Sequence, residues 1–188
     1  YLDRDDDNNG GQATYQVTPG SDIQALINFP NGPHAAGDTD PKTLTLTYQN
    51  NGPMPSMGGS VQTVIPPGFV LDETKLPAGC VATPSSSLQL PGGGTYNGTL
   101  VTCTFPDTVS ATNGRKDFPL LVTLPGSTAN GDFPVLATPP TGLGDPNLAN
   151  NQATTPYSVR PPYANQELTK TKPPGTGPQK PGTELTTT

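Results

Sequence analysis

Oxygen-bearing side chains near the start of the chain are the residues best suited to chemistry. Asp3, Asp5, Asp7 and Asn9 place a side-chain oxygen at every second position. Calcium takes six to eight hard oxygen ligands, so this spacing predicts a Ca²⁺ site. The segment does not match an EF-hand loop, because Asn8 stands where that loop requires glycine. The alternative interpretation is a solvated acidic turn.

A second and weaker oxygen cluster precedes the last strand-like run of the chain. Asp145, Asn147 and Asn150 form it, with Asn151 beside them. If the two clusters are equivalent parts of successive units, each lies at a junction, where a bound calcium ion would stiffen the joint. Calcium is the one cofactor that the sequence suggests.

Catalytic motifs give little support for an enzyme. The chain has one histidine, His34, in a turn rich in proline and glycine, and it contains neither Gly-x-Ser-x-Gly nor His-Glu-x-x-His. Paired carboxylates can hydrolyse glycosides, but the acids of this chain cluster at residues 3–7 or lie in turns. The sequence therefore predicts a protein that is not an enzyme and has no catalytic residues.

The two cysteines, Cys80 and Cys103, each lie beside a strand-like run. In an oxidising compartment they would close a loop of 23 residues, the difference between 103 and 80. A disulfide of that span stabilises a fold by about 3 kcal/mol on a chain-entropy model. We expect a disulfide that joins neighbours in a sheet, which also leaves no free thiol for a Cys–His dyad. Two buried thiols are the alternative.

Two further residue types could contribute to the surface chemistry. Asn97 begins an Asn-Gly-Thr sequon in a glycine-rich turn and is a candidate glycosylation site. Tyr15, Tyr96, Tyr157 and Tyr163 could form a platform for sugars, although packing in the core or at a sheet edge is the simpler expectation.

Composition narrows the classes of partner. The formal net charge is −6, whereas nucleic-acid binding needs clustered cations. No run of about 18 apolar residues occurs, so no transmembrane segment is expected. Charged residues make up 13% of the chain, and Thr, Ser and Asn supply the polarity instead, as in many secreted β-proteins. The chain begins at Tyr1 without an initiator methionine or signal peptide, and we interpret it as mature, processed or excised.

Alternation with a period of two predicts about eight strands, while proline and glycine interrupt every candidate helix. The clearest strand is 43–48, in which Leu44, Leu46 and Tyr48 share one face. Pro134 favours an edge position for its strand, because proline cannot donate to a ladder. Short strands separated by turn clusters predict an all-β sandwich. The expected strands are 23–29, 43–48, 60–65, 69–71, 99–105, 117–124, 132–138 and 153–159.

The chain repeats itself at its two ends. Residues 7–17 and 150–159 both read as Asn-Asn, then Gln-Ala-Thr, then Tyr-x-Val, and residues 32–39 resemble residues 177–184. The offsets, 142 from Asn8 to Asn150 and 145 between the second pair, are close to one domain length. We therefore divide the chain into an N-terminal extension (1–21) like the last strand of a preceding repeat, a sandwich (22–159), and a tail rich in Pro and Thr (160–188) like the first strand of a following repeat.

Several stretches together resemble one family. They are a strand followed by Gln-Asn-Asn-Gly-Pro at 44–53, Ile-Pro-Pro-Gly-Phe at 65–69, and Asp-Pro-Asn-Leu-Ala-Asn-Asn-Gln-Ala-Thr at 145–154. The resemblance is to the immunoglobulin-like repeat called domain of unknown function eleven, found in tandem in large prokaryotic cell-surface and secreted proteins. It covers 22–159 and implies an immunoglobulin-like β-sandwich with a structural or adhesive role. Residues 38–42 are longer than the family pattern, and the tail stops early.

The expected function is that of a non-enzymatic extracellular structural protein: a subunit or repeat of a cell-surface filament, sheath or adhesin stalk. Its partners would be copies of itself or adjacent repeats. Neighbours would share strands, with 13–17 and 167–172 as the candidate linkers, because an added strand satisfies an open sheet edge with backbone hydrogen bonds. One alternative is a cell-surface module that binds glycans or another ligand. Another is a slice of a very long adhesin.

Overall fold

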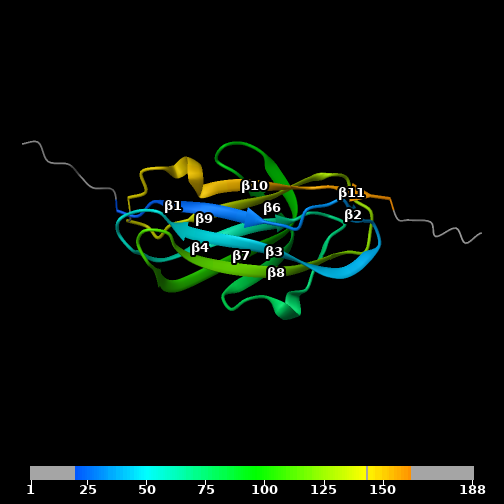
Figure 1. Cartoon of the computed structure of the whole chain (residues 1–188), viewed down its shortest axis with the longest axis horizontal. Coiled ribbons are helices and arrows are strands. Elements are labelled where there is room, and N and C mark those ends of the chain that lie inside the picture. The colour runs from blue at the N-terminus through cyan, green and yellow to red at the C-terminus, as the bar shows by residue number, and fades with distance from the viewer. Residues whose placement is uncertain (1–19, 143, 162–188) are drawn as a thin grey trace, which may run out of the picture.

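The computed structural model describes residues 20–142 and 144–161 and shows a β-sandwich of two antiparallel sheets (Figure 1). The four-stranded sheet has the order β1 (Ile23–Asn28), β3 (Asp38–Asn50), β8 (Gly114–Leu124) and β5 (Val70–Leu71). The five-stranded sheet has the order β10 (Gln152–Tyr157), β9 (Gly131–Thr138), β4 (Ser56–Ile65), β7 (Thr95–Val109) and β6 (Cys80–Gln89). A parallel pair, β2 (His34–Ala35) and β11 (Val159–Arg160), and two 3₁₀ turns, η2 (Glu73–Lys75) and η3 (Leu148–Asn151), complete it.

The core lies between the two sheets and follows the period-two pattern of the sequence. Leu44, Leu46 and Tyr48 of β3 are fully buried, as their alternation predicts. Their neighbours on β8, Phe118 and Leu120, point into the same layer. The predicted all-β sandwich is therefore confirmed. The longer stretch before the second predicted strand is a bulge, where the β3–β8 register shifts between Asp38 and Lys42.

One long hairpin goes beyond the predicted strands. β7 runs well past the expected 99–105, and β6 forms a ten-residue strand of which only the first residues looked strand-like. The end of this hairpin covers the outer face of the five-stranded sheet, where Leu88 and Leu90 bury Val64 in a second small apolar cluster. The backbone N–H of Gly92 donates to Gln152 Oε1 at 2.9 Å, which ties the hairpin tip to β10.

The edge position predicted from Pro134 is wrong, since β9 lies between β10 and β4. The physical reason is that the β4–β9 ladder covers residues 135–138 of β9 and ends at the pair Thr63 and Val135, so it does not reach Pro134. The Pro134 carbonyl faces β4 and accepts the Thr63 hydroxyl at 2.5 Å. Because a strand residue points its N and C=O the same way, the proline nitrogen faces a position where no ladder donor is needed.

The strands run along the long axis, so the loops gather at two opposite ends (Figure 1). We call the end where the described chain begins the N pole; it includes residues 20–22, 51–57 (the start of β4 among them), 110–113 and 144–151. We call the other end the C pole; it includes residues 29–37, 66–69, 125–130 and 158–161. The described chain begins at Gly20 on the N pole and ends at Pro161 on the C pole (Figure 1).

Candidate functional site at the two poles

A buried amide organises the N pole. Asn50 is fully buried, and its Oδ1 accepts the backbone N–H of Asp22 at 3.2 Å and of Gly52 at 3.0 Å. Its Nδ2 donates to the carbonyl oxygens of Met54 at 2.7 Å and Ser110 at 3.3 Å. A Cβ at position 52 would lie 2.4 Å from the Asp22 nitrogen, so only glycine fits there. The Asn-Asn-Gly-Pro motif is thus a locked turn that fixes the start of β1.

The weaker predicted oxygen cluster lies at this pole, and its side chains make hydrogen bonds within the protein. Asp145 accepts the N–H of Ile23 at 3.1 Å and that of Asn147 at 3.0 Å. Asn150 Nδ2 donates to Asp22 Oδ1 at 2.9 Å. The structure therefore brings Asp145 and Asn150 to the first strand, and adds Asp22, which sequence reasoning did not single out. The Asn147 side chain is exposed and makes no capping hydrogen bond to η3.

Three buried oxygens at the N pole have no hydrogen-bond partner among the described residues: Ser21 Oγ, Asn150 Oδ1 and Asn151 Oδ1. Such groups are costly to bury unsatisfied, by about 1–3 kcal/mol each, unless water or an ion completes them. Their chemistry fits a hard cation, although nowhere in residues 20–142 and 144–161 do three His, Cys, Asp or Glu side chains group as a metal site would. Calcium at Asp145, Asn147 and Asn150 stays a prediction.

The first predicted calcium cluster, Asp3, Asp5, Asp7 and Asn9, lies outside the described residues, as do the candidate linker strands 13–17 and 167–172. Tyr15 and Tyr163 also lie outside them.

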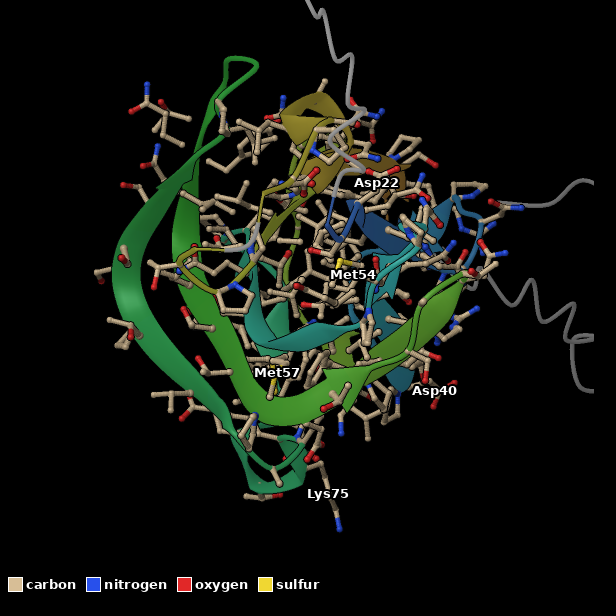
Figure 2. The ribbon with its side chains drawn as sticks, turned by 90° about the vertical axis from the view of Figure 1, so that its left-hand side faces the viewer. Asp22, Asp40, Met54, Met57 and Lys75 are labelled. Atoms are coloured by element: carbon tan, nitrogen blue, oxygen red, sulfur yellow. A yellow bond between two sulfur atoms is a disulfide. The ribbon has the colours of Figure 1, made fainter. Side chains whose placement is uncertain are left out.

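Exposed apolar side chains gather at the N pole. Figure 2 looks onto this end of the molecule and shows Met54 between Asp22 and Met57. The exposed fractions are 53% for Met54, 72% for Met57 and 65% for Leu148, the first residue of η3. The sequence marks these three residues only as apolar side chains in a turn or at the start of a strand.

The C pole carries a groove made by a bend in the β6–β7 hairpin. The register shifts between Thr83 and Ser86, Ser85 has φ of 52°, and Gly98 has φ of 154°. A Cβ on Gly98 would lie 2.1 Å from the carbonyl oxygen of Ile65, so the close approach of the two strands requires glycine. The groove beside the bend has a volume of about 680 Å³ and is lined chiefly by prolines, serines and Asn97.

A second hollow of about 380 Å³ adjoins this groove through Pro66, Pro67 and Asn97, and also contains Tyr96 and Asp132. The exposed Asn97 side chain lies where both hollows meet, so the predicted glycosylation acceptor is accessible.

The two described tyrosines of the predicted platform, Tyr96 and Tyr157, both line the second hollow but differ in burial. Tyr157 is 8% exposed and packs against Phe69 and Phe133, with ring centroids 5.0 and 4.8 Å away. Burial raises the pKa of its hydroxyl, which is consistent with a core position. Tyr96 is half-buried beside the outer cluster around Val64. Core packing, the simpler of the two expectations, describes Tyr157, whereas the Tyr96 ring also lines the second hollow.

His34 serves the structure of the C pole. Its side chain is 7% exposed, its Nε2 lies 3.0 Å from the Pro30 carbonyl oxygen, and its ring centroid lies 4.8 Å from that of Phe29. Its backbone N–H donates to Ser158 at 2.8 Å, which helps to hold β2 against β11.

The predicted disulfide is confirmed. Cys80 and Cys103 are directly opposite each other on β6 and β7, with an S–S distance of 2.04 Å. The bridge occupies both thiols, so neither cysteine is a free nucleophile. It also indicates folding in an oxidising environment. None of the described residues belongs to a helix long and apolar enough to span a membrane.

Several solved structures are similar to the chain. The chain is similar to the CARDB domain of a Pyrococcus furiosus protein, whose crystal structure is in complex with di-metal ions; the TM-score is 0.45 at 15% identity, covering 78% of this chain and 95% of that one. The solution structure of the same domain matches with a TM-score of 0.43 at 13% identity, covering 75% and 96%. An uncharacterized Nocardia farcinica protein with an immunoglobulin-like fold matches with 0.39 at 10% identity, covering 71% and 97%.

No protein-family model and no curated protein matches the chain. The assignment of an immunoglobulin-like β-sandwich therefore rests on the chain's own sheets, strand order and core.

Proposed function

We propose that the chain is a non-enzymatic structural module of an extracellular filament, sheath or adhesin stalk, in which neighbouring units share strands. In this proposal the sandwich is one unit of the tandem surface repeat that the sequence resembles. The extensions 1–21 and 160–188 are the parts that join it to its neighbours.

The observation that carries this proposal is the position of the chain at the two ends of the sandwich. The described chain begins at the N pole and ends at the C pole, at opposite ends of the long axis (Figure 1). Units connected through such positions line up end to end, as an extended polymer requires. The repeat of residues 7–17 at 150–159 supports the same arrangement, since it gives successive junctions matching sequence.

An open sheet edge supports strand sharing. β8 pairs with β3 along its length, but on its other side β5 pairs only with Val122 and Thr123. The Leu121 carbonyl accepts the Asp72 N–H at 2.9 Å, and beyond that point the described β8 edge has no partner strand. Pro119 points its nitrogen to the same side as Leu121, so one donor is missing. A proline at an edge limits indiscriminate pairing and still leaves room for a selected partner strand.

Truncation after Pro161 tests the proposal and spares β11. We expect a folded protein with an unchanged circular-dichroism spectrum that stays monomeric, measured by light scattering after gel filtration and by electron microscopy. A matched second variant keeps the tail but replaces Thr169 and Thr171 with proline. This change leaves charge and length nearly unchanged and removes two ladder donors, so it tests the strand pairing of the tail by itself. Filaments formed by the truncated chain would contradict the proposal.

The mass of the chain from its source separates a subunit from a slice of a tandem array. A denatured mass near 19.4 kDa would mean that the end strands join separate molecules. A mass many times larger would mean that they join covalent neighbours within one long adhesin.

A ligand-binding role is the second candidate, and the C-pole groove is the observation that favours it. The groove offers polar side chains from Ser85 to Ser87, and the adjoining hollow adds Asp132 and the ring of Tyr96. Such a mixture suits the hydroxyl groups and apolar faces of a glycan. Binding on a glycan array that is lost in Tyr96→Ala and Asp132→Asn variants would favour this role, and an array without signal would count against it.

A further inference from the structure

The N pole holds most of the exposed large hydrophobic side chains of the described residues. Five large hydrophobic side chains are exposed in residues 20–142 and 144–161. Three of them, Met54, Met57 and Leu148, are at this pole. The Met54 N–H donates to the Gly20 carbonyl at 3.1 Å, and a Cβ on Gly20 would lie 3.4 Å from the Gly144 carbonyl oxygen. The loops that carry Met54 and Leu148 are therefore neighbours, and Met57 follows the first of them at the start of β4. Exposed methionines are adaptable docking surfaces.

The same pole is negatively charged. Asp22 and Asp145 are partly exposed, and neither forms an ion pair with a cation of the described residues. At the adjacent start of β8, Arg115 is paired with Asp117 at 2.7 Å, and Lys116 is paired with Asp107. These cations are thus already neutralised, so a basic partner is favoured at this surface.

One part of the chain has the opposite charge. Residues 162–188 contain three lysines and two glutamates, a net charge of +1. Residues 1–19 contain one arginine and four aspartates, a net of −3, and residues 20–161 contain five cations and nine acids, a net of −4. The segment that follows Pro161 is therefore the only basic part. It also supplies apolar residues, among them Leu168 and Leu185.

We propose that the N-pole surface formed by Met54, Met57, Leu148 and Asp22 binds residues 162–188 of a second copy of the chain. This inference rests on the proposed function and names the surface through which it operates. The segment begins at the C pole, the end of the sandwich farthest from this surface (Figure 1). A second copy arranged end to end presents its N pole to that segment directly. The apolar side chains supply contact area, and the carboxylate selects the lysines.

Polar substitution of the two methionines tests the apolar part of the surface in the full-length chain. For Met54→Ser with Met57→Ser we expect the protein concentration needed for assembly to rise about tenfold or more, because two contact side chains are removed. The control is Val70→Ser with Val81→Ser, which changes two valines that are 53% and 63% exposed and lie outside the N pole. Equal assembly by the methionine variant and the wild-type chain would overturn the proposal.

Zero-length crosslinking identifies the occupant. A carbodiimide joins a carboxylate to a lysine amine only when the two are in contact. In assemblies mixed from ¹⁴N and ¹⁵N full-length chains, we expect mixed-isotope crosslinks from Asp22 to Lys170, Lys172 or Lys180. Crosslinks within single chains only would overturn the second copy as the occupant. Lysine crosslinks that avoid the N pole altogether would overturn the surface itself.

The proposal and the proposed function fail in different ways. Assembly that survives truncation after Pro161 contradicts the proposed function of the tail. Assembly that needs the tail but tolerates the methionine substitutions contradicts only the role of the N-pole surface and is compatible with strand sharing.

Discussion

At the scale of single residues, the polar side chains with the most consequence are those buried among backbone groups. Asn50 satisfies two N–H groups and two carbonyls at once, so its amide replaces several water contacts in a turn that has no ladder. Its presence explains why an Asn-Asn-Gly-Pro motif, weak as a signal, specifies one geometry. Asp145 has a similar role, since its carboxylate caps the outward-facing N–H of Ile23 on β1.

The pH dependence of stability has an identifiable source in Asp117. Burial alone would raise the pKa of this carboxyl, but hydrogen bonds from Arg115 and Thr47 outweigh it and hold the pKa below its usual value. A lowered pKa in the folded state stabilises the protein above the unfolded pKa of about 3.9. That contribution is lost as the pH falls through the folded pKa.

Asp117→Asn tests this source of stability. We expect a loss below about 1 kcal/mol at neutral pH, because the pair is largely exposed, and a difference from the wild-type chain that disappears in strong acid. Urea unfolding at several pH values measures it. Glu73→Gln, at an exposed acid on η2, is the control. A difference that stays constant across the acid range would show that the carboxylate charge is not its cause.

At the scale of elements, the far end of the β6–β7 hairpin, residues 86–97, is a flap over the outer face of the five-stranded sheet. Leu90 is 5% exposed in the small cluster with Val64 and Leu88, separate from the main core. For Leu90→Ser we expect amide-exchange protection of residues 86–97 to fall by about tenfold or more, since burying a leucine contributes about 2–5 kcal/mol. Protection of β3 should change little. Val81→Ser, exposed on the same hairpin, is the control.

The outcome that would contradict a separate flap is an equal loss of protection in β3 and in residues 86–97. The hairpin would then unfold together with the main core.

The strands with strong alternation could be predicted from the sequence, and those with other determinants could not. The buried faces of β3 and β8 come directly from their spacing. Most of β6 escaped prediction because residues 83–87 are polar apart from Pro84 and mostly exposed, so pairing with β7 and not periodicity makes them a strand. β2 and β11 are two-residue parallel partners more than a hundred residues apart, which no local pattern reveals.

The candidate site was predicted in the same uneven way. Asp145 and Asn150 were found as a cluster of oxygens, but Asp22 belongs to it only through tertiary contact with Asn150. The N-pole methionines carry no sequence signal, because exposure is a property of the fold.

At the scale of the whole molecule, calcium bound at the predicted clusters would stiffen the junctions between units. If the predicted clusters bind Ca²⁺, the melting temperature should rise in millimolar Ca²⁺ relative to EDTA, because a ligand at a hundred times its Kd stabilises by about 2.7 kcal/mol. Asp3→Asn, Asp5→Asn and Asp7→Asn combined test the first cluster, and Asp145→Asn tests the second. Mg²⁺ is the control, since it demands a tighter octahedral geometry.

Equal melting temperatures in Ca²⁺ and EDTA would contradict both calcium sites. A rise that only one set of variants removes would assign the ion to that cluster.

The positions of the two chain ends have a mechanical consequence. Tension applied through Gly20 and Pro161 acts along the strand axes (Figure 1). β1 would have to slide past β3, where six residue pairs lie side by side, and β10 would have to slide past β9, also over six pairs. Hydrogen bonds loaded in shear share the force and break together, whereas bonds peeled apart break one after another. The sandwich is therefore oriented to resist pulling, and its disulfide hairpin lies outside both sliding ladders.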